Sequence, residues 1–229
     1  MSLWVKICGL KTLPALDAAL EAGADCVGFV FFAPSPRHLS LETARVLGAG
    51  VRGRARKVAV SVDADDALLA ASIEALRPDM LQLHGHETPR RVAEIKRRFG
   101  LPVIKALPVA ERADLAAADA YAGLAERLMF DARAPLDATR PGGHGQSFDW
   151  HLLQDVDPGL PFMLSGGLGA DNVAEALRIT AASGVDVSSG VERTPGEKDV
   201  QKIADFVRAA RAAQAVQPRG SRSEIASSS

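Results

Sequence analysis

The sequence predicts an α/β fold in which eight βα units close into a (β/α)8 TIM barrel. Short β-rich runs alternate with segments of helical spacing along the chain, and such alternation is typical of parallel strands joined by helical crossovers. Division of the 229 residues by eight gives about 29 per unit, the size of a βα repeat. Periodicity does not show whether the first and last strands meet, so a doubly wound open sheet is the competing topology.

Eight short runs rich in apolar and β-branched residues predict the strands of this barrel. They cover residues 4–8, 25–31, 57–62, 80–84, 103–107, 128–131, 162–165 and 185–188. Apolar residues at helical spacing predict the helices between them. These cover residues 13–22, 41–49, 66–76, 89–99, 114–124 and 172–182.

A single domain is expected, because no Pro/Gly/Ser-rich linker divides the repeats into two blocks. We assign residues 1–213 to the barrel. Residues 214–229 read QAVQPRGSRSEIASSS, with almost nothing to bury, and are expected to form a disordered polar tail. The longest stretch without regular structure inside the domain is 134–147, and a loop of that length in a compact barrel is usually functional or mobile.

The charges nearly cancel, since 27 Lys and Arg residues face 28 Asp and Glu residues. This balance argues against binding to nucleic acid or to a membrane surface and favours a small-molecule partner. No run approaches the roughly 20 apolar residues of a membrane span, and no signal peptide precedes the first strand, so we expect a cytoplasmic protein. We expect it to be a monomer or a homodimer. Cys8 and Cys26 are expected to be free thiols, because a chain of this length needs no disulfide.

Polar residues gather where predicted strands end, which is the face that carries the chemistry of a barrel. Because side chains alternate along a strand, Lys6 and Cys8 share the inner face of the first strand. Gln82 and His84 do the same on the fourth strand, and Asp131 ends the sixth. A thiol, an ammonium, an imidazole and a carboxylate are therefore expected to converge on one mouth.

Structural roles are the alternatives for these residues. Lys6 could be an interior cation paired with a carboxylate, and His84 a hydrogen-bonded structural histidine. Cys26 lies early in the second strand, far from its carboxyl end, and is expected to be a core residue. No metal site is expected, because Cys8, His84 and Asp131 come without a repeated ligand spacing such as Cys-x-x-Cys.

Two glycine-containing loops indicate a phosphate site. Residues 165–169 (SGGLG) follow the seventh strand, and residues 188–190 (SSG) follow the eighth. Glycines let backbone N–H groups approach an anion, and the helix after the first loop supplies partial positive charge. Barrels often hold a phosphate with these two loops, although each motif alone could be a tight turn.

Seven stretches form a set that runs in a fixed order over residues 3–210. They are KICGL at 6–10, PSPR at 34–37, LQLHG at 81–85, FD at 130–131, FDW at 148–150, SGGL at 165–168 and DVSSGVE at 186–192, with GEKD at 196–199 behind them. As a set they resemble the phosphoribosylanthranilate isomerase family of tryptophan biosynthesis.

The resemblance implies an Amadori rearrangement without a cofactor. N-(5-phosphoribosyl)anthranilate, an aminoaldose, would become 1-(2-carboxyphenylamino)-1-deoxyribulose 5-phosphate, an aminoketose. The resemblance also implies that Asp131 is the general acid at the ring oxygen, Cys8 the general base at C2, and Arg37 the ligand of the anthranilate carboxylate. The phosphate would bind at the loops 165–169 and 188–190. Together with Arg37, the substrate-binding residues would be Lys6, Gln82, His84, Gly166, Gly167, Asp186, Ser188, Ser189 and Gly190.

The residue types suit these roles. A free thiol has a pKa of about 8.5, so a base at Cys8 needs a lowered pKa, for which Lys6 is the candidate cause, or activation by the substrate's own cation. An ordinary aspartic acid is ionised at pH 7, so burial or a neighbouring anion must keep the proton on Asp131. The guanidinium of Arg37 can bind a carboxylate through two parallel hydrogen bonds.

Two positions depart from the family pattern: His144 stands where a threonine is usual, and Ser61 where an aromatic residue is more common. Two other functions stay open. One is a related aminoaldose-ketose isomerase of histidine biosynthesis, although that class carries an aspartate at the position of Cys8. The other is a non-catalytic phosphate-binding barrel, against which the intact set of Cys8, Asp131 and Arg37 argues.

Overall fold

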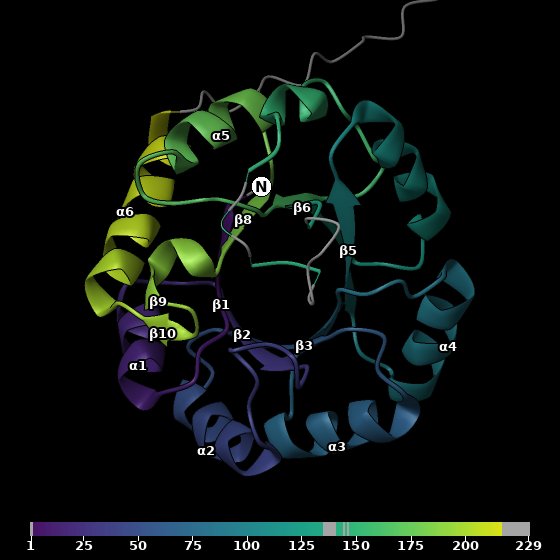
Figure 1. Ribbon diagram of the computed structural model, residues 1–229, viewed down its shortest axis with the longest axis vertical. Coiled ribbons are helices and arrows are strands. Elements are labelled where there is room, and N and C mark those ends of the chain that lie inside the picture. Colours follow the sequence, from purple (N-terminus) through teal and green to yellow (C-terminus); the bar gives the residue numbers. More distant parts are fainter. Residues whose placement is uncertain (1, 135–140, 144, 146, 217–229) are drawn as a thin grey trace, which may run out of the picture.

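Eight parallel strands form a closed barrel, and a ring of helices surrounds it (Figure 1). The computed structural model describes residues 2–134, 141–143, 145 and 147–216. β1 pairs with both β2 and β8, with Val5 opposite Val185, so the sheet has no free edge and the open-sheet alternative is excluded. The strands are β1 (Trp4–Cys8), β2 (Cys26–Phe31), β3 (Arg56–Ser61), β4 (Met80–Leu83), β5 (Val103–Val109), β6 (Arg127–Ala132), β7 (Phe162–Leu164) and β8 (Gly184–Val187).

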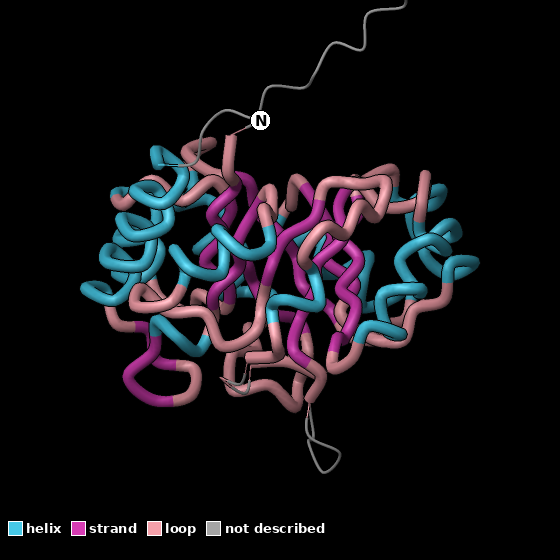
Figure 2. The backbone as a smooth tube through the Cα atoms, turned by 90° about the horizontal axis from the view of Figure 1, so that it is seen from above, coloured by secondary structure: helices cyan, strands magenta, loops and turns pink. Residues whose placement is uncertain are grey.

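The helices lie outside the strands, as the side view shows (Figure 2). The α-helices are α1 (Leu13–Glu21), α2 (Leu41–Val51), α3 (Asp66–Leu76), α4 (Pro89–Phe99), α5 (Val173–Thr180) and α6 (Val200–Val216). Short 3₁₀ helices are η1 (Arg112–Tyr121), η2 (Trp150–Leu153) and η3 (Ser189–Val191). A small antiparallel hairpin of β9 (Glu192–Thr194) and β10 (Glu197–Lys198) projects at the end of the barrel opposite the N-terminus.

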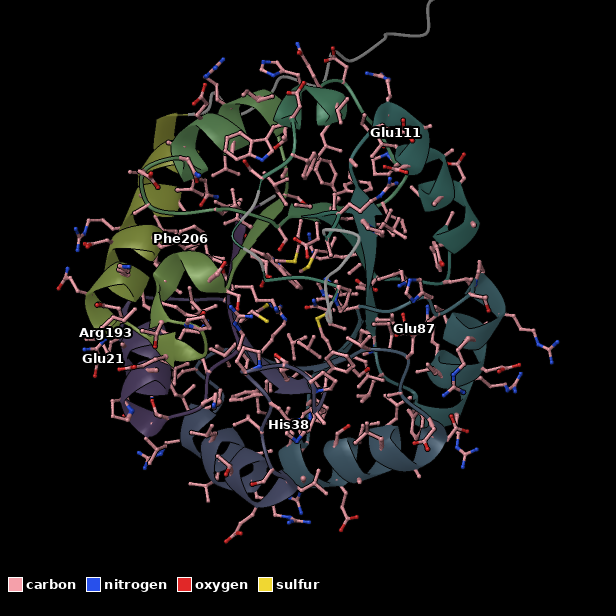
Figure 3. All side chains as sticks on the ribbon, viewed as in Figure 1. Glu21, His38, Glu87, Glu111, Arg193 and Phe206 are labelled. Carbon is pink, nitrogen blue, oxygen red and sulfur yellow. The ribbon has the colours of Figure 1, made fainter. Side chains whose placement is uncertain are left out.

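Side chains alternate between the inside of the barrel and the layer under the helices. Cys8 and Cys26 belong to the inner apolar cluster, and both are free thiols. Val5 and Ile7 belong to the larger outer cluster, together with helix residues such as Phe206 of α6 (Figure 3). The predicted faces of the first strand and the core position of Cys26 are therefore confirmed.

Four of the α-helices begin with a residue whose side chain caps the helix N-terminus. Thr12, Ser40, Asp65 and Thr88 each accept a hydrogen bond from the backbone N–H three residues on, at 2.8–3.4 Å. Such a cap satisfies an N–H group that has no partner within the helix. The caps also fix the far ends of the loops that follow β1 to β4, which are loops at the carboxyl face of the barrel.

The segment after β5 differs from the prediction. An α-helix was expected over residues 114–124, whereas the chain forms the 3₁₀ helix η1. Its buried side chains, Ala118 and Tyr121, are three residues apart, which matches the three residues per turn of a 3₁₀ helix. Side chains of Glu111 and Asp114 form a capping box at its start.

Several boundaries also differ. His84, Ser165 and Ser188, predicted as the last strand residues, are the first residues of the following loops. Helix α6 continues to Val216, beyond the expected end of the barrel at residue 213. The rest of the expected tail, residues 217–229, lies outside the described residues, as does most of the expected loop 134–147. No helix in the described part of the chain is long and apolar enough to span a membrane.

Phe206→Ala is expected to lower the free energy of unfolding by about 3–5 kcal/mol, because the fully buried ring leaves a cavity between α6 and the barrel. Urea denaturation measures the change. Val200→Ala is the matched control on the same helix: that side chain is 47% exposed, and the expected change is within about 0.5 kcal/mol. Equal effects of the two substitutions would contradict the packing of α6 described above.

Candidate active site

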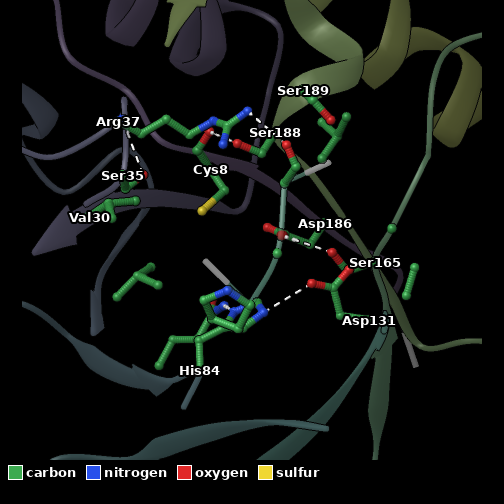
Figure 4. Close-up of a pocket in the computed structure, with 18 of the residues that line it drawn as sticks. Cys8, Val30, Ser35, Arg37, His84, Asp131, Ser165, Asp186, Ser188 and Ser189 are labelled. Carbon is green, nitrogen blue, oxygen red and sulfur yellow. Dashed lines mark hydrogen bonds and ion pairs between the residues drawn. The ribbon is translucent and has the colours of Figure 1, made fainter. Parts of the chain in front are cut away.

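A pocket opens at the carboxyl ends of the strands, and most of the predicted site residues meet in it (Figure 4). Two predicted residues do not line it. Lys6 lies deeper in the barrel with no exposed surface. Gly190 lies behind the lining and packs so closely on Leu168 that a Cβ would overlap the carbonyl oxygen of that residue. The predicted residues in the lining are Cys8, Arg37, Gln82, His84, Asp131, Gly166, Gly167, Asp186, Ser188 and Ser189.

Lys6 and Asp186 form a buried ion pair across the seam between β1 and β8. The Nζ atom of Lys6 lies 2.7 Å from Oδ1 of Asp186. The hydroxyl of Ser165 donates to the other oxygen, Oδ2, at 3.4 Å. Lys6 is therefore the interior cation paired with a carboxylate that the sequence left open as an alternative.

Burial raises the pKa of the Cys8 thiol, and the positive charge of Lys6 opposes this rise without cancelling it. Burial also acts to lower the pKa of Lys6, but the charges of Asp186 and Cys8 outweigh it and the pKa is raised. The free protein therefore holds a protonated thiol beside a charged ammonium at neutral pH. Lys6 alone therefore does not bring the pKa of the Cys8 thiol below its ordinary value.

Gly28 on β2 makes room for the thiol and the ammonium. It is the register partner of Cys8. A Cβ at position 28 would lie 2.9 Å from Sγ of Cys8 and 2.9 Å from Nζ of Lys6, closer than real Cβ contacts. The sequence reasoning did not single out Gly28, because only the pairing of β1 with β2 places it opposite Cys8.

Asp131 is hydrogen-bonded to His84, whose Nε2 lies 2.9 Å from Oδ2 of the aspartate (Figure 4). The other ring nitrogen, Nδ1, lies 2.8 Å from Nε2 of Gln82, and that amide nitrogen also donates to the sulfur of Met129 at 3.4 Å. A thioether accepts hydrogen bonds and cannot donate them, so the amide nitrogen faces Met129 and donates to Nδ1. The proton of a neutral His84 is therefore on Nε2, where it is donated to Asp131.

A second buried ion pair holds the loop that begins at His84. Nζ of Lys105 lies 2.9 Å from Oε2 of Glu87 and donates to the carbonyl of Gly85 at 2.7 Å. The hydroxyl of Tyr121 donates to the backbone carbonyl of Glu87 at 2.9 Å. The loop that follows His84 is thus tied to β5 and η1.

Arg37 lies on the other side of the Cys8 thiol from His84 (Figure 4). Its Nε and Nη2 atoms each lie 2.7 Å from one carboxylate oxygen of Glu192, and Nη2 also donates to the carbonyl of Gly143 at 3.3 Å. In the free protein the two parallel hydrogen bonds expected for a substrate carboxylate are therefore made to Glu192. The third guanidinium nitrogen, Nη1, lies beside Gly143 at the pocket.

Glu192 also binds Lys198, whose Nζ lies 2.7 Å from Oε1. Both residues were quoted in the family motifs, but the sequence reasoning assigned them no role, because Glu192 meets Arg37 across 155 positions of the chain. Burial acts to raise the pKa of Glu192, but the hydrogen bond from Arg37 and the charge of Lys198 outweigh it and leave the pKa below its ordinary value. The carboxylate is thus ionised between two cations.

The two predicted anion loops lie side by side at the pocket. Gly166 and Gly167 have φ of 89° and 64°, a region that favours glycine. A Cβ at Gly166 would also lie 2.7 Å from the backbone nitrogen of Ala132, so this loop can pass close to β6 only with glycine. Asn172, just before α5, accepts from the N–H of Gly169 at 2.8 Å and donates to the carbonyl of Gly167 at 2.9 Å, which holds the loop in place.

Of the two departures from the family pattern, only Ser61 can be placed. His144 lies outside the described residues. Ser61 is buried but does not line the pocket, whereas its neighbours Val60 and Val62 do, so its hydroxyl points toward the helices. The described residues contain no group of three or more His, Cys, Asp or Glu side chains that could hold a metal ion.

A family model described as N-(5'phosphoribosyl)anthranilate (PRA) isomerase matches residues 5–209. The chain belongs to this family. A Bradyrhizobium diazoefficiens protein named N-(5'-phosphoribosyl)anthranilate isomerase is 65% identical over 214 residues, which are 93% of this chain and 96% of that protein. A Nitrobacter hamburgensis protein of the same name is 64% identical over 214 residues, 93% and 95% of the two chains.

Solved structures of phosphoribosylanthranilate isomerases share the barrel. The Thermotoga maritima structure has a TM-score of 0.83 at 34% identity and covers 92% of this chain and 99% of that one. Another, with a TM-score of 0.79 at 32% identity and the same coverage, was solved in complex with reduced 1-(o-carboxyphenylamino)-1-deoxyribulose 5-phosphate. The family assignment made from the motifs is therefore confirmed, and with it the fold and the enzyme class.

Lys6→Met is expected to raise the pKa of the Cys8 thiol further, because it removes a positive charge that opposes the effect of burial. The thiolate is the reactive form, so the rate of Cys8 alkylation should rise at higher pH than in the parent, with both proteins in a Cys26→Ser background. Lys6→Met alone leaves the Asp186 carboxylate unpaired, and the control Lys6→Met/Asp186→Asn removes that charge as well. In the control, the dependence of the alkylation rate on pH should move part of the way back toward that of the parent. Superimposable profiles in parent and Lys6→Met would exclude an effect of Lys6 on the thiol.

Proposed function

We propose that this chain converts N-(5-phosphoribosyl)anthranilate to 1-(2-carboxyphenylamino)-1-deoxyribulose 5-phosphate in tryptophan biosynthesis. The observation that carries the proposal is the shared pocket of Cys8, Asp131, Arg37 and the two glycine loops, which offers a base, an acid, a carboxylate ligand and a phosphate site together. Membership of the isomerase family supports it, as does the ligand bound in the related structure. Each step combines a proton transfer with a shift of bonds within the substrate, and aminoaldose and aminoketose are isomers, so the reaction requires no cofactor.

Ring opening is the step assigned to Asp131. Its carboxylic acid donates a proton to the furanose ring oxygen, the bond from that oxygen to C1 breaks, and the nitrogen lone pair forms a C1=N double bond. The aspartate becomes a carboxylate as the iminium forms. His84 assists here, because its Nε2–H already points at Oδ2 of Asp131 and stabilises the carboxylate that develops.

Proton removal at C2 is the step assigned to Cys8. The thiolate takes the C2 proton, and the C–H electrons form a C1=C2 double bond while the nitrogen becomes neutral. Movement of a proton from the C2 hydroxyl to C1 then gives the ketone. Asp131 has then lost a proton to the former ring oxygen and Cys8 has gained one from C2, and exchange with solvent restores both groups before the next cycle.

The working enzyme therefore needs a proton on Asp131 and none on Cys8. The free protein favours the opposite arrangement at the thiol, since burial raises the Cys8 pKa. The substrate can reverse this preference with its own charges. Its anionic groups favour a proton on Asp131, and the iminium formed on ring opening favours the thiolate. This is the second of the two routes to a base that the sequence left open.

We infer that the enzyme works in the cytoplasm as a monomer or a homodimer and binds neither nucleic acid nor membranes. The near-zero net charge supports the absence of such polyanionic partners. A related Thermotoga maritima enzyme is described as dimeric, which is a precedent for the homodimer. Sedimentation equilibrium at several protein concentrations distinguishes the two assembly states.

The activity itself is tested by following the fluorescence of phosphoribosylanthranilate as it is consumed. The aminoaldose substrate of the corresponding histidine-biosynthesis isomerase is assayed in parallel. Turnover of the first substrate and not of the second is expected, because Cys8 stands where the histidine-pathway class has an aspartate. Turnover of neither would favour a non-catalytic phosphate-binding barrel.

Cys8→Ala and Asp131→Ala are each expected to lower kcat at least about a hundredfold in this assay, as the loss of a general base or acid does. Cys26→Ala is the control, because that thiol is also buried but does not line the pocket and lies on the first residue of β2. It should leave kcat within about threefold of the parent. Near-normal turnover in either active-site variant would remove that residue from the mechanism.

A further inference from the structure

Glu192 is the shared partner of two buried cations beside the pocket. Its Oε1 atom accepts from Nε of Arg37 and from Nζ of Lys198, each at 2.7 Å, and its Oε2 accepts from Nη2 of Arg37 at 2.7 Å. The three side chains are at most 5% exposed. A carboxylate that binds a guanidinium through both oxygens holds the plane of the guanidinium as well as its position.

Lys198 carries the connection onward to the second anion loop. Its Nζ donates to the carbonyl of Ser188 at 2.8 Å and to the hydroxyl of the same residue at 3.3 Å. That hydroxyl donates in turn to the carbonyl of Cys8 at 3.2 Å. A continuous chain of hydrogen bonds therefore runs from Arg37 through Glu192 and Lys198 to Ser188.

Backbone contacts hold the central residues of this series of hydrogen bonds in place. Glu192 and Lys198 are register partners in the β9–β10 hairpin. Nζ of Lys202 on α6 donates to the backbone carbonyl of Glu192 at 2.8 Å. The hairpin thus places one carboxylate between two cations, and without that carboxylate two like charges would remain buried in adjacent positions.

We propose that Glu192 is a positioning residue that joins the Arg37 carboxylate site to the Ser188 phosphate loop, so that the two anionic ends of the substrate bind cooperatively. The proposal rests on the function proposed above. Bound phosphate orders the loop that holds Lys198, Lys198 and Glu192 hold Arg37, and Arg37 is then in place for the carboxylate. Cooperation of this kind selects ligands that carry both anions over ligands that carry one.

Glu192→Gln tests the bridge, by which we mean the hydrogen-bonded connection from Arg37 through Glu192 and Lys198 to Ser188. The substitution keeps the shape of the side chain and removes its charge. KM is expected to rise at least about tenfold while kcat stays within about threefold, as the loss of binding interactions predicts. The dissociation constant of inorganic phosphate, measured by calorimetry, should also rise at least about threefold. Glu197→Gln is the control on the same hairpin, since Glu197 is exposed and lies 3.6 Å from its partner Arg193; it should change neither value.

Arg37→Ala distinguishes binding of the carboxylate end of the ligand from binding of its phosphate end. It should raise the dissociation constant of the aminoketose product and leave that of inorganic phosphate unchanged, whereas Glu192→Gln raises both. Unchanged phosphate affinity in a folded Glu192→Gln variant, or equal effects of Glu192→Gln and Glu197→Gln, would overturn the proposal. Phosphate binding does not require turnover, so a protein that binds phosphate but does not isomerise its substrate would contradict the proposed function and still test the bridge.

A double-mutant cycle covers the case in which Glu192→Gln does not fold. Arg37→Ala and Ser188→Ala are combined, and product affinity is measured for each variant. The two effects should be non-additive while the bridge is intact and should become additive in a Lys198→Met background, which cuts the bridge and keeps the Arg37–Glu192 pair. Additive effects with Lys198 present would overturn the proposal.

Discussion

The ion pair between Lys6 and Asp186 joins the first and last strands of the barrel at their point of contact. The two residues are register partners on β1 and β8, and both side chains are buried. A buried charge is tolerated only with a partner, and removal of either one costs about 3–5 kcal/mol. The same ammonium lies beside the Cys8 thiol, in the space that Gly28 leaves open. One interaction therefore contributes both to the closure of the barrel and to the surroundings of the candidate base.

Carboxylates also pair with other cations near the pocket, so that in a chain of net charge -1 the excess positive charge there is small and local. Lys105 is paired with Glu87 under the loop of His84. Arg37 and Lys198 share Glu192, and two cations on one carboxylate leave one positive charge near the pocket. The proposed function assigns the attraction for the substrate to that excess and to backbone amides of the glycine loops, and not to a field over the whole surface.

Burial outweighs the neighbouring charges at the Cys8 thiol and raises its pKa, whereas at Lys6 and Glu192 the neighbouring charges outweigh burial. Lys6 lies close to Cys8, but desolvation of the thiolate outweighs the attraction, so the thiol stays protonated until a ligand changes the charges in the pocket. Hydrogen bonds from Gln82 fix which nitrogen of His84 holds the proton, and His84 in turn supports Asp131. A buried, protonated thiol is also less open to side reactions than a thiolate would be.

The sequence by itself determined the eight strands and the inward faces of Lys6 and Cys8, because these depend on local alternation. Its family followed from the resemblance of motifs that are contiguous along the chain. The sequence could not determine strand ends, where His84 and Ser188 begin loops, nor the 3₁₀ form of η1, because both depend on packing against neighbouring elements. Tertiary structure alone decided that Gly28 faces Cys8 and that Glu192 holds Arg37. The physical reason is distance along the chain: the register of paired strands and the closure of the barrel bring together residues whose types carry no local pattern.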